Sequence, residues 1–365
     1  MERRSATPRR DWRERVESLG FDFHTIDGKP YWDETICYRF TEEEVDQLDD
    51  ATAELERLCF GVVERVIEEK LYDRLFIGEE SQALIEESWR RGDRNVIGRF
   101  DLSWDGTGDP KLLEYNADTP TALFEAAVVQ WDWLESTHAG ADQFNSIHEK
   151  LLEAWAGYGL TGMVHFSCVR DHAEDYATTT YLRDTCLQAG HPTEFLYIDE
   201  IGWNGLAFVD ADDRPITALF KLYPWEWLMN EEFSQHIGPS RIRMIEPAWK
   251  MILSNKAVLP LLWETFEGHP NLLPASFDPA AIGGPMVEKP VLGREGQDVA
   301  IHRAGVPRAA PGMVYQALAP LYSQGGRHAV IGSWVIASQA AGIGIREDDG
   351  PVTINTSRFV PHYFE

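Results

Sequence analysis

Two short segments joined by a turn constrain the fold of this chain more than any other feature. Residues 96–104 (VIGRFDLSW) and 111–116 (KLLEYN) alternate between polar and apolar side chains, as half-buried strands do. Asp105-Gly106 and Gly108-Asp109-Pro110 between them favour a turn. We therefore expect the two segments to pair as a β-hairpin.

One face of this hairpin is expected to be rich in oxygen donors. Side chains two residues apart share a face of a strand. This rule groups Arg99, Asp101 and Ser103 on the first strand, and Leu112, Glu114 and Asn116 on the second, with Leu113 and Tyr115 opposite. Two carboxylates and a carboxamide are the hard ligands that Mg²⁺ prefers, and an arginine beside them suits a phosphoryl group. The spacing alone is equally compatible with a solvated polar face.

The first half of the chain also predicts helices and a parallel sheet. Residues 41–70 carry apolar side chains at helical spacing behind a capping box of Thr41 and Glu44. Thr119-Pro120 is expected to start a helix that runs to about Glu135. A strand at 163–169, a helix at 173–189 and a strand at 193–198 form a βαβ unit, which predicts parallel strands.

The second half predicts further strands, several of them in hairpins. The expected elements are a hairpin of 206–209 with 215–223, a helical stretch at 241–265, and strands near 286–291, 313–318, 329–337 and 352–354. This mixture indicates an α/β (α+β) protein with more than one lobe.

The charge of the chain excludes some classes of partner. Lys and Arg number 33 and Asp and Glu 60, so the net charge is 33 − 60 = −27. This balance argues against nucleic acid and against anionic membranes. It is compatible with a cationic small substrate, although a solvated acidic surface that aids solubility is the ordinary interpretation. No apolar run is long enough to span a membrane. The four cysteines form no CxxC motif, which favours a reducing, cytoplasmic location.

A second informative segment is 284–299 (GPMVEKPVLGREGQDV). A strand delivers Lys289, and a glycine-flanked loop, Gly293 to Gly296, follows it. Glycines allow backbone N–H groups to approach phosphates closely. Together with Lys256, expected in a helix about thirty residues earlier, this arrangement suits the phosphates of a nucleotide. For either lysine alone, a surface position is the ordinary interpretation.

Two later segments are compatible with the same ligand. The strand at 313–318 contains Gln316, Ala317 and Leu318, and its backbone suits an adenine ring or a plain core. Arg346 stands among close glycines in GIGIRE, where it can reach a phosphate or a carboxylate.

These segments together resemble the synthetase half of glutathionylspermidine synthase and its stand-alone bacterial relatives, the acid–amine ligases. The resemblance covers nearly the whole chain. It rests on RFD at 99–101, LLEYNADTPT at 112–121, KLYPWE at 221–226, WKMILSNKAVLPLLWE at 249–264, EKPVLGREGQDV at 288–299, YQAL at 315–318, GSW at 332–334, GIGIRE at 342–347 and SRFVPHYF at 357–364. It implies a permuted ATP-grasp fold with an additional βαβ-containing lobe.

The resemblance also implies roles for individual residues. Those for metal are Asp101, Glu114 and Asn116, with Glu114 between two Mg²⁺ ions. Those for ATP are Lys256, Lys289, Glu295, Gly296, Gln316, Ala317, Leu318 and Ala319. Arg99 and Arg346 would stabilise the phosphorylated carboxyl group. Thr119, where the family has a serine, and the acidic pair Glu174 and Asp175 would lie near the substrates.

The implied activity is ATP-dependent formation of an amide bond between a small carboxylic acid or peptide and a small amine. The whole chain, 1–365, would be one synthetase domain, with approximate lobes at 1–160, 161–240, 241–330 and 331–365. The differences at KLYPWE and Thr119 leave the acid and the amine open. Two alternatives remain: a small-molecule kinase of the same superfamily and a non-catalytic binding scaffold.

Overall fold

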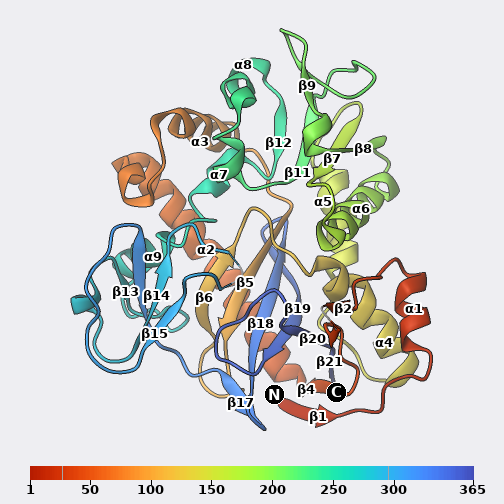
Figure 1. Cartoon of the computed structure of the whole chain (residues 1–365), viewed down its shortest axis with the longest axis vertical. Coiled ribbons are helices and arrows are strands. Elements are labelled where there is room, and N and C mark those ends of the chain that lie inside the picture. Colours follow the sequence, from red (N-terminus) through yellow and green to blue (C-terminus); the bar gives the residue numbers. More distant parts are fainter. Residues whose placement is uncertain (27, 295) are drawn as a thin grey trace.

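The computed structural model describes residues 1–26, 28–294 and 296–365. Its centre is an antiparallel sheet in the order β20-β19-β18-β5-β6, with β17 also paired to β18 (Figure 1). The strands are β5 (Ile97–Ser103), β6 (Lys111–Asn116), β17 (Tyr322–Gln324), β18 (Arg327–Ile336), β19 (Gln339–Asp348) and β20 (Arg358–Val360). The predicted hairpin is confirmed as β5 and β6, and the strand predicted at 329–337 as β18. The strand predicted at 352–354 is wrong, because these residues form a loop after β19.

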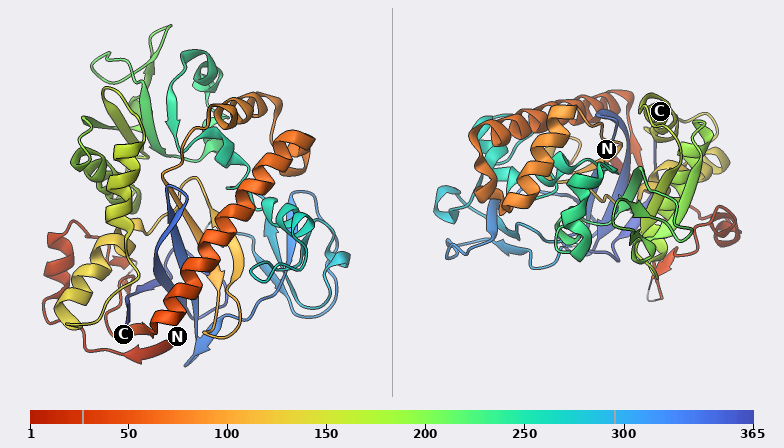
Figure 2. Two further views of the ribbon diagram at one scale, coloured as in Figure 1. Left: turned by 180° about the vertical axis from the view of Figure 1, so that it is seen from behind. Right: turned by 90° about the horizontal axis from the view of Figure 1, so that it is seen from above.

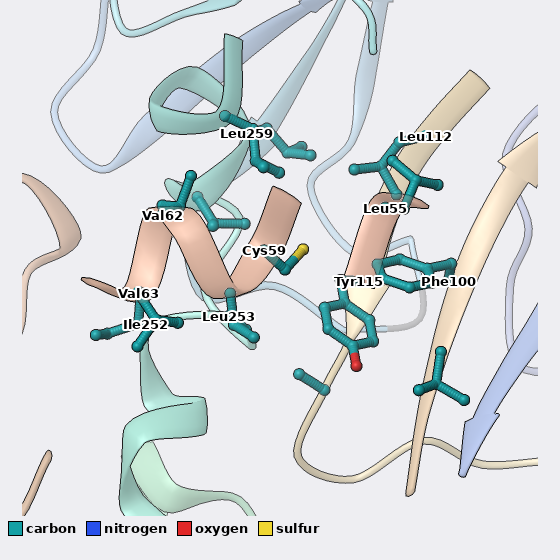
Figure 3. Packing of buried hydrophobic residues seen from close by; sticks show 14 of the residues in the cluster. Leu55, Cys59, Val62, Val63, Phe100, Leu112, Tyr115, Ile252, Leu253 and Leu259 are labelled. Atoms are coloured by element: carbon teal, nitrogen blue, oxygen red, sulfur yellow. The ribbon is translucent and has the colours of Figure 1, made fainter. Parts of the chain in front are cut away.

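Helix α2 (Glu42–Glu69) lies across one face of the central sheet (Figure 2). Its capping box of Thr41 and Glu44 is formed as predicted. Leu55 and Cys59 of α2 belong to the same buried cluster as Phe100 and Tyr115 of the hairpin (Figure 3). The rings of Phe100 and Tyr115 stack with centroids 3.9 Å apart. The apolar face of the hairpin is thus buried under α2, and its polar face points to the other side.

A second sheet is parallel and has the order β12-β11-β7-β8. Its elements are β7 (Val164–Cys168), α6 (Ala173–Gln188), β8 (Thr193–Tyr197), β11 (Ala218–Leu222) and β12 (Arg243–Ile245), so the predicted βαβ unit is confirmed. The predicted hairpin of 206–209 with 215–223 is partly right. The two segments meet at an antiparallel bridge between Val209 and Pro215, where the Ile216 N–H donates to the carbonyl oxygen of Phe208 at 2.8 Å. β10 (Phe208–Val209) pairs further with β9 (Gly202–Trp203), and β11 leaves the hairpin to pair with β7 and β12 in the parallel sheet, where all five of its residues are buried.

The third sheet is antiparallel, in the order β13-β16-β14-β15, and lies beside the central sheet (Figure 1). Its strands are β13 (Ala275–Ser276), β14 (Met286–Pro290), β15 (Ala300–His302) and β16 (Met313–Ala317). The strands predicted at 286–291 and 313–318 are therefore confirmed. The helical stretch predicted at 241–265 is only partly right, since it begins with β12 and is interrupted before α9 (Val258–Thr265).

Both ends of the chain lie at one edge of the molecule, because β1 (Glu2–Ser5) and β21 (His362–Phe364) both pair with β4 (Ile36–Phe40). The remaining strands are β2 (Thr25–Ile26) and β3 (Lys29–Pro30). The other α-helices are α1 (Trp12–Ser18), α3 (Glu79–Arg91), α4 (Gln130–Thr137), α5 (Ile147–Gly157), α7 (Trp225–Leu228) and α8 (Ile237–Ser240). The short 3₁₀ and π segments are η1 (Leu71–Leu75), η2 (Glu125–Val129), η3 (Ile198–Glu200), η4 (Glu232–His236), η5 (Ala248–Met251) and η6 (Pro279–Ala281).

The helix predicted to start at Thr119-Pro120 begins later. Helical backbone starts at Leu123 and passes through the π turn η2 into α4. Arg99 donates from Nη1 to the carbonyl oxygen of Thr121 at 2.6 Å, and Ala122 has a φ of 65°, so this stretch is held out of a helix. Within the described ranges, no helix combines the length and apolar character that a bilayer crossing requires.

Candidate active site

A cavity of about 530 Å³ lies between the central sheet and the third sheet. The residues predicted for the site that line it are Arg99, Asp101, Glu114, Asn116, Thr119, Lys256, Lys289, Gly296, Gln316, Ala317, Leu318, Ala319 and Arg346. Glu295 lies outside the described residues. Glu174 and Asp175 do not line this cavity; they stand at the start of α6. The structure therefore brings together side chains from segments more than 200 residues apart.

The polar face of the hairpin forms one wall of the cavity. Asp101 lies opposite Glu114 and Arg99 opposite Asn116 across the two strands. The register shifts between Asp101 and Leu102. This bulge corrects one expectation: Leu112 does not share a face with Glu114 but is buried in the core, and Leu113 lines the cavity instead.

Arg99 and Asp101 form a bidentate ion pair. The Arg99 Nε and Nη2 atoms donate to the two oxygens of Asp101 at 2.7 and 3.1 Å. The Asn116 amide donates to Asp101 at 3.2 Å and to Glu114 at 3.3 Å. Burial acts to lower the pKa of Arg99, but Asp101 and Glu114 outweigh it and raise this pKa above its ordinary value. The guanidinium is thus a fixed positive charge on this wall.

Two lysines face Glu114 from the opposite side. Lys256, which comes just before α9 and not inside a helix as predicted, has Nζ 3.4 Å from Glu114 Oε2. It also donates to the carbonyl oxygen of Gly293 at 2.5 Å. Lys289 on β14 donates to the carbonyl oxygen of Leu113 and to Oε1 of Gln316, both at 2.8 Å.

The charges of these groups depend on one another. Burial acts to raise the pKa of Glu114, but Lys256, Lys289 and Arg99 overcome it and lower this pKa, so the carboxylate is ionised. Burial lowers the pKa of Lys289 to about 8, although Glu114 acts in the other direction. An anion entering beside Lys289 would favour its charged form.

The glycine-rich loop lies against the segment after β19. Gly296 has a φ of 72°, and a Cβ atom placed there would meet the carbonyl oxygen of Thr353 at 2.7 Å. Only glycine suits this close approach. Arg294 of the same loop donates to Thr119 Oγ1 and forms an ion pair with Glu226, both at 3.0 Å. The loop is therefore linked to the residue predicted to touch the acid.

The strand predicted to hold adenine forms another part of the lining. Ala317, Leu318 and Ala319 follow one another along the cavity. The side chain of Gln316 is buried, and its amide donates to the carbonyl oxygen of Leu112 at 2.9 Å. Gln316 thus supports Lys289 and β6 through its side chain.

Arg346 approaches the cavity from β19. Its guanidinium donates at 3.0 Å to the carbonyl oxygens of Ile354, Asn355 and Ser357. It also lies 5.2 Å from the ring centre of Tyr31. These contacts fix its orientation and leave it a full positive charge beside the cavity.

Sequence reasoning missed an acidic group beside Arg346. Tyr31 donates from its hydroxyl to Glu125 Oε1 at 2.6 Å, and Glu125 is fully buried. Glu125 belongs to a stretch that looks like an ordinary helix, so no local signal marks it. Arg294, in contrast, stands in a glycine-flanked loop that the sequence already singled out.

A buried ion pair also went unpredicted. Lys221 on β11 donates to Asp118 Oδ1 at 2.8 Å, and Asp118 Oδ2 accepts from the backbone N–H of Trp225 at 2.8 Å. Asp118 lies two positions after Asn116, which is one of the residues predicted to bind metal. The pair thereby fixes the parallel sheet to the end of the hairpin.

The donor set on the hairpin suits a hard cation. In the described part of the chain, no group of three His, Cys, Asp or Glu side chains gathers that could enclose a metal. The hairpin offers two carboxylates and one carboxamide oxygen, and this smaller set fits Mg²⁺, which keeps several waters and binds substrate phosphates. The ionised state of Glu114 supports the same fit.

Comparisons with known proteins assign the chain to a class. Over its full length, the chain is 42% identical to a protein of Haemophilus influenzae named "Putative acid–amine ligase", and it covers all of that protein. It is 31% identical to the trypanothione synthetase of Crithidia fasciculata over 77% of this chain and 49% of the relative. It is 27% identical to the bifunctional glutathionylspermidine synthetase/amidase of Escherichia coli over 89% of this chain and 58% of the relative. The chain is an enzyme of the class of ligases that form C–N bonds.

The family follows from a match over residues 3–365. The chain belongs to the glutathionylspermidine synthase preATP-grasp family. The resemblance expected from the motifs is therefore confirmed. A solved structure, the apo form of a glutathione synthetase-like effector from Globodera pallida, matches with a TM-score of 0.57 at 12% identity, covering 90% of this chain and 89% of that one. This match supports the mixed α/β architecture with a glutathione-synthetase-like fold.

Proposed function

We propose that the protein is an ATP-dependent carboxylate–amine ligase that works through an acyl phosphate. The observation that carries the proposal is the approach of Lys256 and Lys289 to Glu114 across the cavity. Cations that hold phosphates and oxygen ligands that hold Mg²⁺ must meet at the γ-phosphate in such an enzyme. The residues proposed for these two roles line one cavity of about 530 Å³, which supports the proposal.

In this proposal, the nucleotide spans the cavity from the third sheet toward the hairpin. Lys256, Lys289 and the loop at Gly296 hold its phosphates, and 316–319 border the adenine. Asp101, Glu114 and Asn116 would hold Mg²⁺, two ions in the family pattern, which supplies charge neutralisation on the phosphates when bound. The fold would be a permuted ATP-grasp fold. In this chain the residues proposed to bind Mg²⁺ precede the lysines proposed to bind phosphate, which is the reverse of the order in most ATP-grasp enzymes.

The chemistry requires little covalent work from the protein. A carboxylate oxygen of the acid attacks the γ-phosphorus of ATP, the bond to ADP breaks, and an acyl phosphate forms. The nitrogen of the amine then attacks the acyl carbon, loses a proton, and displaces inorganic phosphate. Arg99 and Arg346 lie where they would stabilise the negative charge of the phosphorylated carboxyl group. Catalysis is then mainly positioning and charge neutralisation.

The substrates we propose are a small carboxylic acid or peptide and a small amine. Relatives named above are synthetases of glutathionylspermidine and trypanothione, so acids and amines of that size are the first to be tested. Thr119 is proposed to contact the acid, and Glu174 and Asp175 to lie near the substrates. We further propose lobes at 1–160, 161–240, 241–330 and 331–365, and a cytoplasmic location, where the four free, buried thiols would stay reduced.

A screen for ADP release tests the proposal. Acids are crossed with amines in the presence of ATP and Mg²⁺, and the products are identified by mass spectrometry. An amide whose formation matches ADP release supports a ligase. ADP release with a phosphorylated product and no amide would instead indicate a kinase.

A further inference from the structure

Another cavity, of about 510 Å³, lies at the end of the central sheet where β5 begins and β18 turns into β19. We call it the second cavity. Helices α2, α3 and α5 contribute to its lining, which includes Phe60, Trp89, Arg94, Lys150, Trp249 and Ser338. None of the described residues lines both this cavity and the candidate active site. Small-molecule sites typically have volumes of about 300–1,000 Å³, so the second cavity is large enough to be one.

Three aromatic rings form one side of the second cavity. The ring centres lie 5.7, 5.4 and 5.5 Å apart in the pairs Phe60–Trp89, Phe60–Trp249 and Trp89–Trp249. Trp249 is buried, and its Nε1 atom donates to the carbonyl oxygen of Asp93 at 2.9 Å. Phe60 and Trp89 are only half-buried. Their rings therefore leave apolar surface that another flat ring could cover.

Two cationic side chains also line the second cavity. Arg94 donates from Nη1 to the carbonyl oxygen of Gly157, and Lys150 donates from Nζ to the carbonyl oxygen of Ala340. Both partners are neutral groups, and each cation carries further N–H donors. Arg94 and Lys150 can therefore donate to an anion without losing these contacts.

The negative charge of the lining is smaller than these cations suggest at first sight. Asp93 and Glu153 are the carboxylates among the described residues of the lining. Asp93 is engaged by an ion pair with Arg91 at 2.6 Å, and Glu153 is exposed. Because the chain as a whole has a net charge of −27, the second cavity is one of the places where it can attract an anion.

The polar side of the second cavity is held in place by hydrogen bonds. Ser338 donates to Oδ1 of Asn95 at 3.0 Å, and the Asn95 amide donates to Glu56 at 3.3 Å. Tyr158 donates from its hydroxyl to the carbonyl oxygen of Arg94 at 2.7 Å, which fixes the backbone that carries the guanidinium. The site is thus largely preformed, so a ligand would pay little to order it.

We propose that the second cavity binds a small aromatic carboxylate. Its ring packs against Phe60 and Trp89, and its carboxylate accepts hydrogen bonds from Arg94 and Lys150. A guanidinium matches the two oxygens of a carboxylate, and aromatic rings attract one another in stacked or edge-to-face contacts. An uncharged aromatic compound or an aliphatic anion would use only half of this arrangement. The proposal goes beyond ligation, because it involves none of the residues proposed for ATP, Mg²⁺ or the substrates.

Equilibrium dialysis with two aromatic acids tests the proposal. The full chain is dialysed against indole-3-acetate and against 1-naphthoate, with indole-3-acetamide and acetate as probes that lack the charge or the ring. We expect at least one aromatic acid to bind and the acetamide and acetate to bind about tenfold more weakly or less.

Variants then assign the binding to the second cavity. Arg94→Gln removes the guanidinium, and Phe60→Leu keeps an apolar side chain without the ring, so we expect each to weaken the acid about fivefold or more. Trp89→Leu takes the place of Phe60→Leu if urea unfolding shows that the latter does not fold. Arg90→Gln, at an exposed position of α3 outside the lining, and Lys289→Met, in the candidate active site, should leave this affinity unchanged.

Four results would overturn the inference. They are the absence of binding for both aromatic acids, equal affinity for the acetamide, unchanged affinity in Arg94→Gln or in the ring variant, and loss of binding in Lys289→Met, which would place the acid in the candidate active site instead. The screen for ADP release is unaffected by any of these results, so this inference and the proposed function fail separately.

Discussion

Two buried acidic regions of this molecule have opposite surroundings. Glu246 accepts hydrogen bonds from the backbone N–H groups of Val96 and Ile97 at 3.0 and 2.9 Å, and it forms an ion pair with Lys250 at 2.9 Å. Glu125 is equally buried, yet one of its oxygens has no partner, and the charge of a second carboxyl group, Glu174, raises its pKa further. In the first arrangement both carboxylate oxygens have partners, and in the second one oxygen has none.

The difference separates a buried carboxylate whose charge is compensated from one whose charge is not. The Glu246 pair holds the start of β5 and so positions the hairpin that carries Asp101. Glu125 accepts one hydrogen bond, from the Tyr31 hydroxyl, and burial raises its pKa, so its charged form is disfavoured. Four substitutions can break or sharpen this distinction.

The largest expected effect is on stability. Glu246→Ala leaves Lys250 buried without its carboxylate partner and removes two acceptor bonds, so we expect a loss of about 3–5 kcal/mol in the free energy of unfolding. Urea unfolding measures it. Glu153→Ala, at an exposed position of α5, is the control and should change stability by less than about 0.5 kcal/mol. A loss below about 1 kcal/mol in Glu246→Ala would remove the distinction.

The next effect is larger on turnover than on folding. Asp101→Asn removes one of the oxygen charges proposed for Mg²⁺, so we expect kcat to fall about 10²–10³-fold. The substitution also removes the charge that faces Arg99, but the pair is partly exposed and the amide oxygen still accepts one hydrogen bond, so we expect the free energy of unfolding to fall by about 1–2 kcal/mol, less than in Glu246→Ala. ADP release and urea unfolding measure the two quantities. Near-normal ADP release would refute the metal assignment.

The third prediction concerns pH. The raised pKa of Glu125 in the folded state means that the folded protein binds a proton more tightly than the unfolded chain does, so this group reduces stability as pH rises from about 4.5 to about 7. Glu125→Gln removes this pH-dependent contribution to the free energy of unfolding. We expect the stability of the variant relative to wild type to increase by about 2 kcal/mol between pH 5 and pH 8. A difference that stays constant with pH would show that Glu125 is not destabilised in its charged form.

The smallest effect is on nucleotide affinity. Lys289→Met removes one phosphate donor, and we expect ATP to bind about tenfold more weakly by calorimetry, equivalent to about 1.4 kcal/mol. Lys29→Met, at an exposed position, is the control. Unchanged affinity in the Lys289 variant would argue against its proposed role.

Local patterns predicted the parts of the fold that depend on a few neighbouring residues. The alternation of polar and apolar residues around Arg99, Asp101 and Glu114 predicts correctly which side chains share the polar face of the hairpin. The pattern is regular because α2 buries the apolar residues that alternate with them. It misplaced Leu112, because a bulge depends on the pairing of two strands and leaves no mark in the periodicity of one. The pattern at 215–223 predicts the turn of a hairpin but not the parallel pairing of β11, because the parallel partners of β11 lie far away in the sequence.

The candidate site shows the same limit. The motifs identified many of the side chains that line the cavity, several of which stand beside glycines or on an alternating strand. They could not identify Glu125, whose surroundings come from Tyr31, α6 and β19. The resemblance to a family brought in Glu174 and Asp175, but the sequence had no means to show that the charge of Arg346 acts on Glu174.

The position of β6 at the edge of the central sheet has a further consequence. β6 ends the central sheet, and an edge strand with open carbonyl groups is prone to pair with another chain. Here the carbonyl oxygens of Leu112 and Leu113 accept from Gln316 and Lys289 of the neighbouring sheet. Lys289, which we propose to bind phosphate, therefore also covers the edge of the sheet. A variant that lacks this lysine would self-associate more readily and would also bind ATP more weakly.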